Sequence, residues 1–194
     1  KKLIIRHAGS FVKDLATPGV STLPPLRIET EGGPVRRAPY RASPRDREFI
    51  RESINKLLAA GCISPWGFPV IVVAHPSGKL RMCVNYTKLN DLTTSDSYPL
   101  PPLQEVLAAL GGKAYFSTLD LCWGYHQVEV CEEDRPKTTM VTPFGSYQWN
   151  VVSFGLKNAP PHFMRCMDMV LSGLHWTIAC CWIDDILIFS NTFE

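Results

Sequence analysis

The chain has 194 residues, of which 45% are hydrophobic and 20% are charged, and its net charge at pH 7 is +2. This composition is that of a globular protein with a sizeable core, and it excludes a disordered tail. No apolar run is long enough to span a membrane, and the apolar run near the start is too short for a signal peptide. Because the first residue is not Met, we expect a piece of a longer chain.

The charge is unevenly distributed along the chain. Residues 1–60 contain twelve Lys and Arg against six Asp and Glu, whereas residues 61–194 contain eight against twelve. A basic leading part and an acidic remainder suit a polyanion held beside a carboxylate cluster, although solvated surface gives similar numbers. The seven cysteines form no C-x-x-C pair, so we expect a reduced, intracellular protein whose cysteines fill the core.

The leading segment has many prolines and little periodicity. We therefore expect an extended N-terminal arm over residues 1–40, with one short strand near 26–28, followed by one domain over residues 41–194. A basic stretch overlaps the boundary, and contact with a nucleic-acid backbone and a solvated connector are equally good interpretations of it. Its members are Arg36, Arg37, Arg41, Arg45, Arg47 and Arg51.

Three helices are predicted. Ser43 is a candidate N-cap for a helix over residues 44–60, which has apolar residues at helical spacing and ends at Gly61. A short amphipathic helix follows at 103–110, and a third runs from an Asn cap over residues 158–174.

Strands alternate with these helices, so the predicted fold class is α+β with antiparallel hairpins. The hairpin over residues 70–86 offers Lys79 and Arg81 near its tip, where they either hold a phosphate or are solvated. Residues 132–134 are expected to form a solvated acidic turn. The predicted strands are residues 70–74, 80–86, 115–121, 125–130, 137–142, 147–152, 178–182 and 186–189.

Two adjacent carboxylates, Asp184 and Asp185, lie between two apolar segments. This pattern predicts strand, tight turn and strand, with both aspartates at the tip. Carboxylates this close repel each other unless a cation lies between them or one holds a proton. Asp120 closes a strand that otherwise looks buried, and it is a candidate third carboxylate. An ordinary Asp-Asp turn and an exposed strand end are the alternatives.

Three carboxylates at strand ends suit magnesium, which prefers carboxylate, carbonyl and water oxygens. Two Mg²⁺ ions about 3.5–4 Å apart can bind the attacking and leaving oxygens of a phosphoryl transfer. The backbone carbonyl of Leu121 can complete such a site. The sequence therefore predicts metal-dependent phosphoryl transfer at Asp120, Asp184 and Asp185.

Several sequence blocks occur in the order found in one enzyme family. They are residues 81–86, 89–90, 98–101, 116–121, 124–127, 133–138, 154–160 and 183–188. From about residue 41 to its end, the chain resembles the reverse transcriptase domain of gypsy-class LTR retrotransposons and their retroviral relatives. Each block alone is moderate evidence, and their shared order is strong evidence.

The resemblance implies the fingers and palm of a right-hand polymerase, truncated before the thumb. It implies an RNA-directed DNA polymerase that uses two Mg²⁺ ions, or Mn²⁺ as a substitute, to add dNTPs to a primer on an RNA or DNA template. It also implies a pol polyprotein with thumb, RNase H and possibly protease and integrase. The expected location is a cytoplasmic virus-like particle, with no membrane partner.

The resemblance also assigns roles to residues outside the carboxylate cluster. Arg81 resembles the finger residue that contacts the incoming triphosphate. Tyr125 matches the aromatic residue that stacks under the deoxyribose and excludes a 2′-hydroxyl. Phe154 and Gly155 match the strip that lines the nucleotide pocket. From the residues alone, Tyr125 and Phe154 are more simply packing residues.

The chain departs from the family pattern at two functional places. Trp182 replaces the usual Tyr before Ile183 at the expected primer end, and Lys79 is the nearest amine where the finger usually has two lysines. These departures leave open a decayed or domesticated fragment that only binds nucleic acid or a protein partner. A third alternative is an RNA-directed RNA polymerase, against which Tyr125 argues.

Overall fold

The chain is seen in a computed structural model that describes residues 5–11, 19, 21–32, 42–65, 71–74 and 80–193. For residues 71–74, 80 and 81 only the backbone is described. Lys79, the side chain of Arg81 and the arginines at 36–41 therefore lie outside the described part. Within that part, no helix combines the length and apolar character needed to cross a membrane.

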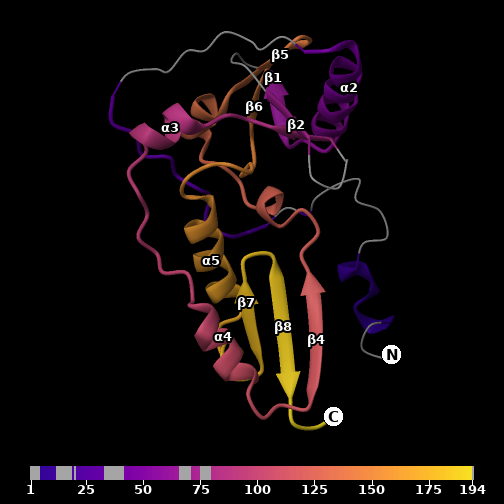
Figure 1. Cartoon of the computed structure of the whole chain (residues 1–194), viewed down its shortest axis with the longest axis vertical. Helices are drawn as coiled ribbons and strands as arrows, with labels where there is room; N and C mark the ends of the chain where they lie inside the picture. Colours follow the sequence, from indigo (N-terminus) through magenta and orange to yellow (C-terminus); the bar gives the residue numbers. More distant parts are fainter. Residues whose placement is uncertain are drawn as a thin grey trace.

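Strands and helices alternate along the chain, which confirms the predicted α+β class (Figure 1). The strands are β1 Ile63–Pro65, β2 Ile71–Ala74, β3 Leu80–Cys83, β4 Tyr115–Asp120, β5 Met140–Thr142, β6 Gly145–Trp149, β7 Ala179–Trp182 and β8 Asp185–Ser190. The α-helices are α2 Pro44–Ala59, α3 Thr87–Leu92, α4 Leu103–Leu110 and α5 Ala159–Val170. The 3₁₀ helices are η1 Ala8–Ser10, η2 Gly124–Gln127 and η3 Glu132–Thr138.

The strands pair antiparallel in three sheets, with orders β1-β6-β5, β2-β3 and β4-β8-β7. Figure 1 shows an upper lobe that holds α2, α3 and the first two sheets, and a lower lobe that holds α4, α5 and the third sheet. One cluster of buried side chains contains Ile54 of α2, Trp149 of β6 and Phe163 of α5. The two lobes therefore share one core.

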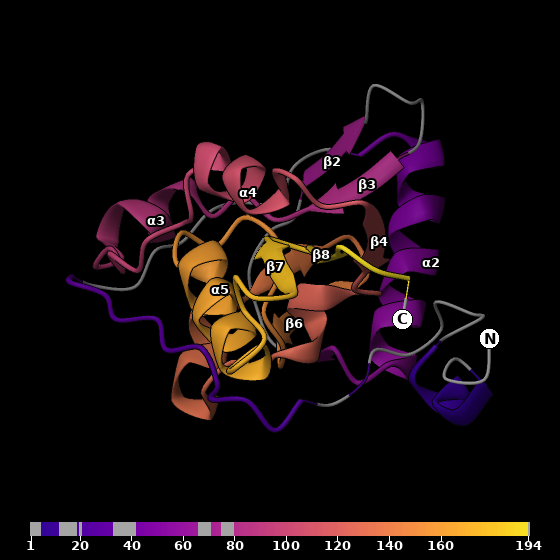
Figure 2. The ribbon, with the colours of Figure 1, turned by 90° about the horizontal axis from the view of Figure 1, so that it is seen from below.

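The β7–β8 hairpin lies between α4 and α5, as the view from below shows (Figure 2). Neighbouring residues of β7 point to opposite faces: Cys181 packs in the main core, whereas Cys180 packs with Val106 of α4. The hairpin is thereby fixed from both sides. Both thiols are free and fully buried. The prediction that the cysteines fill the core is correct for these two and for Cys62 and Cys166, and wrong for the partly buried Cys83, Cys122 and Cys131.

Helix α2 begins and ends nearly where the sequence predicts. The Ser43 side chain accepts a hydrogen bond from the Asp46 backbone N–H at 3.2 Å, and Pro44 occupies the first turn. Ile50, Ile54 and Leu57 form its buried face. The predicted N-cap is therefore confirmed.

Four strand predictions are wrong at one end: residues 137–138 belong to η3, residues 150–152 follow the end of β6, and the other two have a clear local cause. The chain over 125–130 starts as η2 because Trp123 adopts a left-handed conformation (φ 55°) and reverses the backbone, so that Tyr125 and His126 are both buried. A strand would have sent these neighbours to opposite faces. Strand β3 ends at Cys83, because the Asn85 side chain accepts the Thr87 N–H at 3.1 Å and opens α3.

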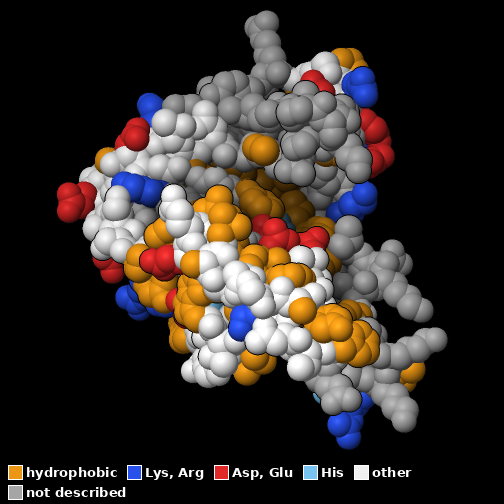
Figure 3. Space-filling model, turned by 60° about the horizontal axis from the view of Figure 1, so that its bottom comes forward, with side chains coloured by type: hydrophobic (Ala, Val, Ile, Leu, Met, Phe, Trp, Pro, Cys, Tyr) orange, Lys and Arg blue, Asp and Glu red, His pale blue; other side chains and the backbone are white. Residues whose placement is uncertain are grey.

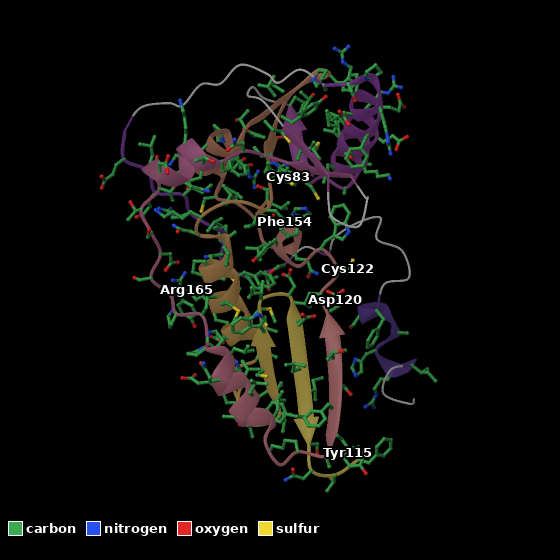
Figure 4. All side chains as sticks on the ribbon, viewed as in Figure 1. Cys83, Tyr115, Asp120, Cys122, Phe154 and Arg165 are labelled. Carbon is green, nitrogen blue, oxygen red and sulfur yellow. The ribbon has the colours of Figure 1, made fainter. Side chains whose placement is uncertain are left out.

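Strand β4 was expected to be buried, and this is wrong: all six of its residues are exposed. It is the edge strand of its sheet, and among the described residues it pairs only with β8. Tyr115 and Asp120 mark its two ends in Figure 4. Apolar composition alone does not distinguish an edge strand from a central one.

Residues 21–32 form an extended strap that packs against both lobes. Leu26, only 2% exposed, pairs with Val130 in a parallel bridge. Its N–H donates to the Glu129 carbonyl at 2.8 Å, and further along the Glu31 N–H donates to the Leu92 carbonyl at 2.9 Å. This part of the predicted arm is extended as expected, while the domain boundary near residue 40 stays a prediction.

The predicted solvated turn at 132–134 is wrong for Asp134, which is buried within η3. Its Oδ2 accepts the Ile28 N–H at 2.8 Å, and its Oδ1 lies 2.6 Å from the Lys137 ammonium. Lys137 in turn donates to the Ile28 carbonyl at 2.6 Å. Asp134 and Lys137 therefore anchor the strap by hydrogen bonds to the backbone of a single residue, Ile28.

Replacing Asp134 by Ala is expected to destabilise the protein by about 2 kcal/mol, because it leaves a buried N–H without an acceptor and Lys137 without its counter-ion. The measurement is the free energy of unfolding in urea. Glu133→Ala is the matched control, since Glu133 is the exposed neighbour in the same helix and should change stability by less than about 0.5 kcal/mol. Equal effects of the two substitutions on the free energy of unfolding would contradict the role of Asp134 as an anchor of the strap.

Candidate active site

A two-residue turn, Ile183 and Asp184, joins β7 to β8. The last strand pair is Trp182 with Asp185, so Asp184 lies at the tip and Asp185 is already the first residue of β8. The prediction that both aspartates occupy the tip is therefore correct only for Asp184. Ile183 has φ 56°, a conformation that β-branched residues rarely adopt and that costs about 1–3 kcal/mol. Such strain is typical of functional turns.

The register of the sheet brings the third carboxylate to this turn. Asp120, the last residue of β4, is directly opposite Asp185, so their side chains share one face with Cβ atoms about 4.5–5.5 Å apart. Asp184 joins them through its backbone carbonyl, which accepts the Leu121 N–H at 3.2 Å. The structure thus places the three predicted aspartates together, although Asp120 is more than sixty residues from the other two in sequence.

These carboxylates lie in the hollow between the two lobes. Figure 3 shows acidic side chains gathered there, with hydrophobic side chains around them. Figure 4 shows Asp120 at the upper end of β4, beside the hairpin tip and below Phe154. The site is therefore open to a ligand while one side of it is apolar.

Asp184 is the most perturbed of the three. Burial raises the pKa of its carboxyl group, and the charges of Asp120 and Asp185 raise it further. Its Oδ1 is buried and has no hydrogen-bond partner among the described residues. A Cβ at Gly124 would lie 3.2 Å from this oxygen, so glycine is needed for the carboxylate to fit. An unpaired buried oxygen beside two other carboxylates is what a cation would satisfy.

The residues present therefore fit a divalent cation. In the described part of the chain, no three acidic, histidine or cysteine side chains are drawn together around one ion position. The Leu121 carbonyl accepts the Gly124 N–H at 3.1 Å, and its second lone pair remains for a metal. The donor set is all oxygen, as magnesium prefers.

An aromatic cluster, formed by the rings of Tyr125, Phe154, Phe163 and His126, lies beside the carboxylates. Tyr125, 7% exposed, makes edge contacts with Phe154 and Phe163, with ring centroids 5.2 and 5.0 Å apart. Burial, and secondly the charge of Asp184, raises the pKa of Tyr125 to about 12. Phe154 is 56% exposed and faces the hollow. The two aromatic residues that the resemblance assigned to nucleotide binding therefore meet beside the aspartates.

His126 is a member of this aromatic cluster that the sequence analysis missed. Its ring packs against Phe154 and Trp149, and its Nδ1 lies 2.8 Å from the Val152 carbonyl. Burial lowers the pKa of His126, so the ring is neutral and Nδ1 donates the hydrogen bond. Its only sequence signal was its place next to Tyr125.

The other predicted residues are only partly placed. Trp182 of β7 is paired with Asp185 of β8. Its side chain is partly buried against the small apolar cluster that contains Val106 of α4. Arg81 is opposite Val73 in the β2–β3 hairpin, but its side chain is outside the described part, as is all of Lys79. Their roles at the primer end and the triphosphate stay predictions.

Three aspartates that meet at one end of an antiparallel sheet, beside a cluster of aromatic rings, form the kind of arrangement that metal-assisted phosphoryl-transfer enzymes use. Residues 73–194 match the family model described as reverse transcriptase (RNA-dependent DNA polymerase), and the chain belongs to this family. The family named by the resemblance is therefore confirmed, while the gypsy class within it stays a prediction.

Relatives come from plant viruses and insect transposons. The chain is 38% identical over 177 residues to the enzymatic polyprotein of Cauliflower mosaic virus (strain Strasbourg), which covers 87% of this chain and 26% of that protein. It is 39% identical over 148 residues to the retrovirus-related Pol polyprotein from transposon 297 of Drosophila melanogaster, covering 74% of this chain and 14% of that protein. The chain thus spans about a quarter or less of these relatives.

Solved structures show the same fold. The foamy viral protease-reverse transcriptase in complex with an RNA/DNA hybrid superposes with a TM-score of 0.87 over 99% of this chain and 26% of that chain. At 19% sequence identity, this likeness shows a shared fold. The upper and lower lobes correspond to the expected fingers and palm.

Proposed function

We propose that this chain forms the fingers and palm of an RNA-directed DNA polymerase that adds dNTPs to a primer 3′ end on an RNA or DNA template. One observation carries the proposal: the sheet register sets Asp120 opposite Asp185, beside the unpaired Oδ1 of Asp184. Two further observations support the proposal: the family to which the chain belongs and the aromatic cluster beside the carboxylates.

The carboxylates would hold the metal ions. Asp120, Asp184 and Asp185 would bind two Mg²⁺ ions, or Mn²⁺ as a substitute, with the Leu121 carbonyl as an additional oxygen. When bound, the ions supply activation of the attacking primer oxygen and neutralisation of charge on the leaving diphosphate.

The aromatic residues would select the sugar. The Tyr125 ring is buried and held between the edges of Phe154 and Phe163, so it cannot move aside. It would form a rigid wall beneath a deoxyribose and exclude a 2′-hydroxyl, while Phe154 and Gly155 line the other side of the nucleotide. Arg81 and Lys79 would contact the triphosphate, and Trp182 and Ile183 the primer end.

The wider context is part of the same proposal. The chain would act within a pol polyprotein that supplies a thumb, an RNase H and possibly a protease and an integrase, in a cytoplasmic virus-like particle and without a membrane partner. The length of the curated relatives, about four or more times the aligned segment, supports a polyprotein.

The test is addition of a single nucleotide to a DNA primer on an RNA template, with Mg²⁺ and labelled dNTP. One addition requires no processivity, so it should be detectable both in the chain and in the chain joined to its downstream sequence. Salt-sensitive RNA binding without extension in either protein would favour the decayed fragment instead. Equal use of rNTP and dNTP would favour an RNA-directed RNA polymerase.

Magnesium is expected to stabilise the protein without any nucleic acid. If Mg²⁺ binds the three aspartates at about tenfold above its Kd, it adds about 1.4 kcal/mol, which raises the melting temperature by about 3 °C. Asp185→Asn should abolish the shift, whereas Asp91→Asn, at an exposed carboxylate of α3, should keep it. An equal shift in both variants would place the ion elsewhere.

A further inference from the structure

The turn that carries Phe154 and Gly155 is fastened to α3 of the upper lobe by one side chain. The Asn90 amide donates from Nδ2 to the Gly155 carbonyl at 2.8 Å. Its Oδ1 accepts the Lys157 N–H at 2.9 Å. The nitrogen and the oxygen of the Asn90 side chain thus each hydrogen-bond to the backbone of the same turn, at Gly155 and at Lys157. These two bonds fix the turn relative to α3.

Two further contacts join the turn to the same part of the upper lobe. Tyr86 is buried just before α3, and its hydroxyl donates to the Thr138 carbonyl at 2.9 Å and accepts from Ser153 Oγ at 3.0 Å. The Lys157 ammonium donates to the Thr93 carbonyl at 2.8 Å. The residues on both sides of Phe154 are therefore held by the segment that contains α3.

Gly155 fits this arrangement through its backbone. Its φ is +93°, and a Cβ there would lie 3.5 Å from the Tyr86 ring. A side chain would be strained by the backbone conformation. The turn can therefore approach Tyr86 closely and present its carbonyl to Asn90.

The Phe154 side chain has few contacts of its own. More than half of it is exposed, and its ring meets only the edges of Tyr125 and His126 among the aromatic rings described. The position of this ring over the hollow is therefore set mainly by the backbone of its turn. Asn90 hydrogen-bonds to that backbone on both sides of Leu156.

We propose that Asn90 is a positioning residue for nucleotide binding, which sets the distance between Phe154 and Tyr125 and so the fit of a nucleoside triphosphate. The inference rests on the proposed function. It extends the substrate-binding machinery to one side chain of α3, that of Asn90 alone, which is outside the carboxylate cluster. Asn90 acts through the Gly155 carbonyl and does not touch the reacting atoms.

The test uses the full reverse transcriptase that contains this chain and measures kcat and KM for one dNTP addition. Asn90→Asp keeps the acceptor for the Lys157 N–H but sets a carboxylate oxygen against the Gly155 carbonyl, so the turn is released on one side. We expect KM for dNTP to rise about tenfold while kcat changes less than about twofold. Asp91→Ala, at the exposed neighbour on α3, should leave both constants unchanged.

The possible outcomes separate the two proposals. An active wild type whose KM is unchanged in Asn90→Asp would overturn the positioning role and leave the proposed function standing. A parallel fall in kcat with unchanged KM would mean general loss of folded enzyme, and would also overturn it. An inactive wild type would overturn the proposed function and this inference with it. A rise in KM with retained kcat and an unchanged urea midpoint is the supporting result.

Discussion

Asp184→Asn is expected to abolish primer extension and, at the same time, to make the metal-free protein more stable. Loss of one metal-binding carboxylate should lower the rate by about 10³-fold, which corresponds to about 4 kcal/mol of transition-state stabilisation. The same carboxylate is repelled by Asp120 and Asp185 and has an unpaired oxygen. Its removal should add up to about 1 kcal/mol to the free energy of unfolding, because water screens part of the repulsion.

The pH dependence of stability gives an independent test of this carboxylate. Since the folded state raises the pKa of Asp184, the folded protein retains a proton that the unfolded chain releases. The contribution of this group therefore favours folding at low pH and is lost as pH rises from its ordinary pKa through the raised one. Asp184→Asn should lack this fall in stability as the pH rises above the ordinary carboxyl pKa, measured by urea unfolding without Mg²⁺.

Asp91→Asn is the matched control for both measurements, because Asp91 is an exposed carboxylate on α3. It should keep primer extension and the pH profile of the wild type. Full extension activity in Asp184→Asn would refute the metal-site assignment. If Asp184→Asn raises the free energy of unfolding, the increase measures directly how much the carboxylate site destabilises the folded protein.

Tyr125→Val is expected to relax the preference for dNTP over rNTP by about 10²-fold or more. The Tyr125 ring is the wall on which the sugar would rest, and Val leaves room for a 2′-hydroxyl. The substitution also opens a cavity in the core and should lower stability by about 3 kcal/mol. The measured quantity is therefore the ratio of kcat/KM for the two nucleotides in one protein, in which the loss of folded enzyme cancels.

Tyr125→Phe separates the ring from its hydroxyl. It keeps the edge contacts with Phe154 and Phe163, so the preference should stay within about threefold of the wild type. A loss as large as that of Tyr125→Val would assign selection to the hydroxyl. An unchanged preference in Tyr125→Val would remove Tyr125 from sugar selection altogether.

The carboxylate site was predictable from the sequence because its pattern is local. A charged residue between two buried apolar segments, as at Asp184, has to lie where the chain turns. The exact register was not predictable: Asp185 belongs to β8 and is opposite Asp120 only because β4 pairs with β8 residue by residue. Sequence periodicity describes which face a residue takes on its own strand, and it contains no information on the partner strand.

The misassigned elements have the same cause. Asp134 looked like surface because its partner, the backbone of Ile28, is 106 residues away. Tyr125 and His126 looked like alternating strand residues because nothing local indicates the left-handed Trp123 before them. The Asn90 contact with Gly155 crosses 65 residues and could not be predicted from either segment. Tertiary contacts decide such positions.

The strap over residues 21–32 has a consequence for the order of folding. It is synthesised before its partners: Asp134 is 106 residues further along than Ile28, and His162, whose Nε2 lies 2.9 Å from the Pro24 carbonyl, is 138 residues further along than Pro24. The strap cannot dock on a ribosome-bound chain until these partners have emerged. Such distant contacts slow folding and make its last step cooperative. Until α5 is available, the buried face of the strap, with Leu26 and Ile28, stays exposed to chaperones and proteases.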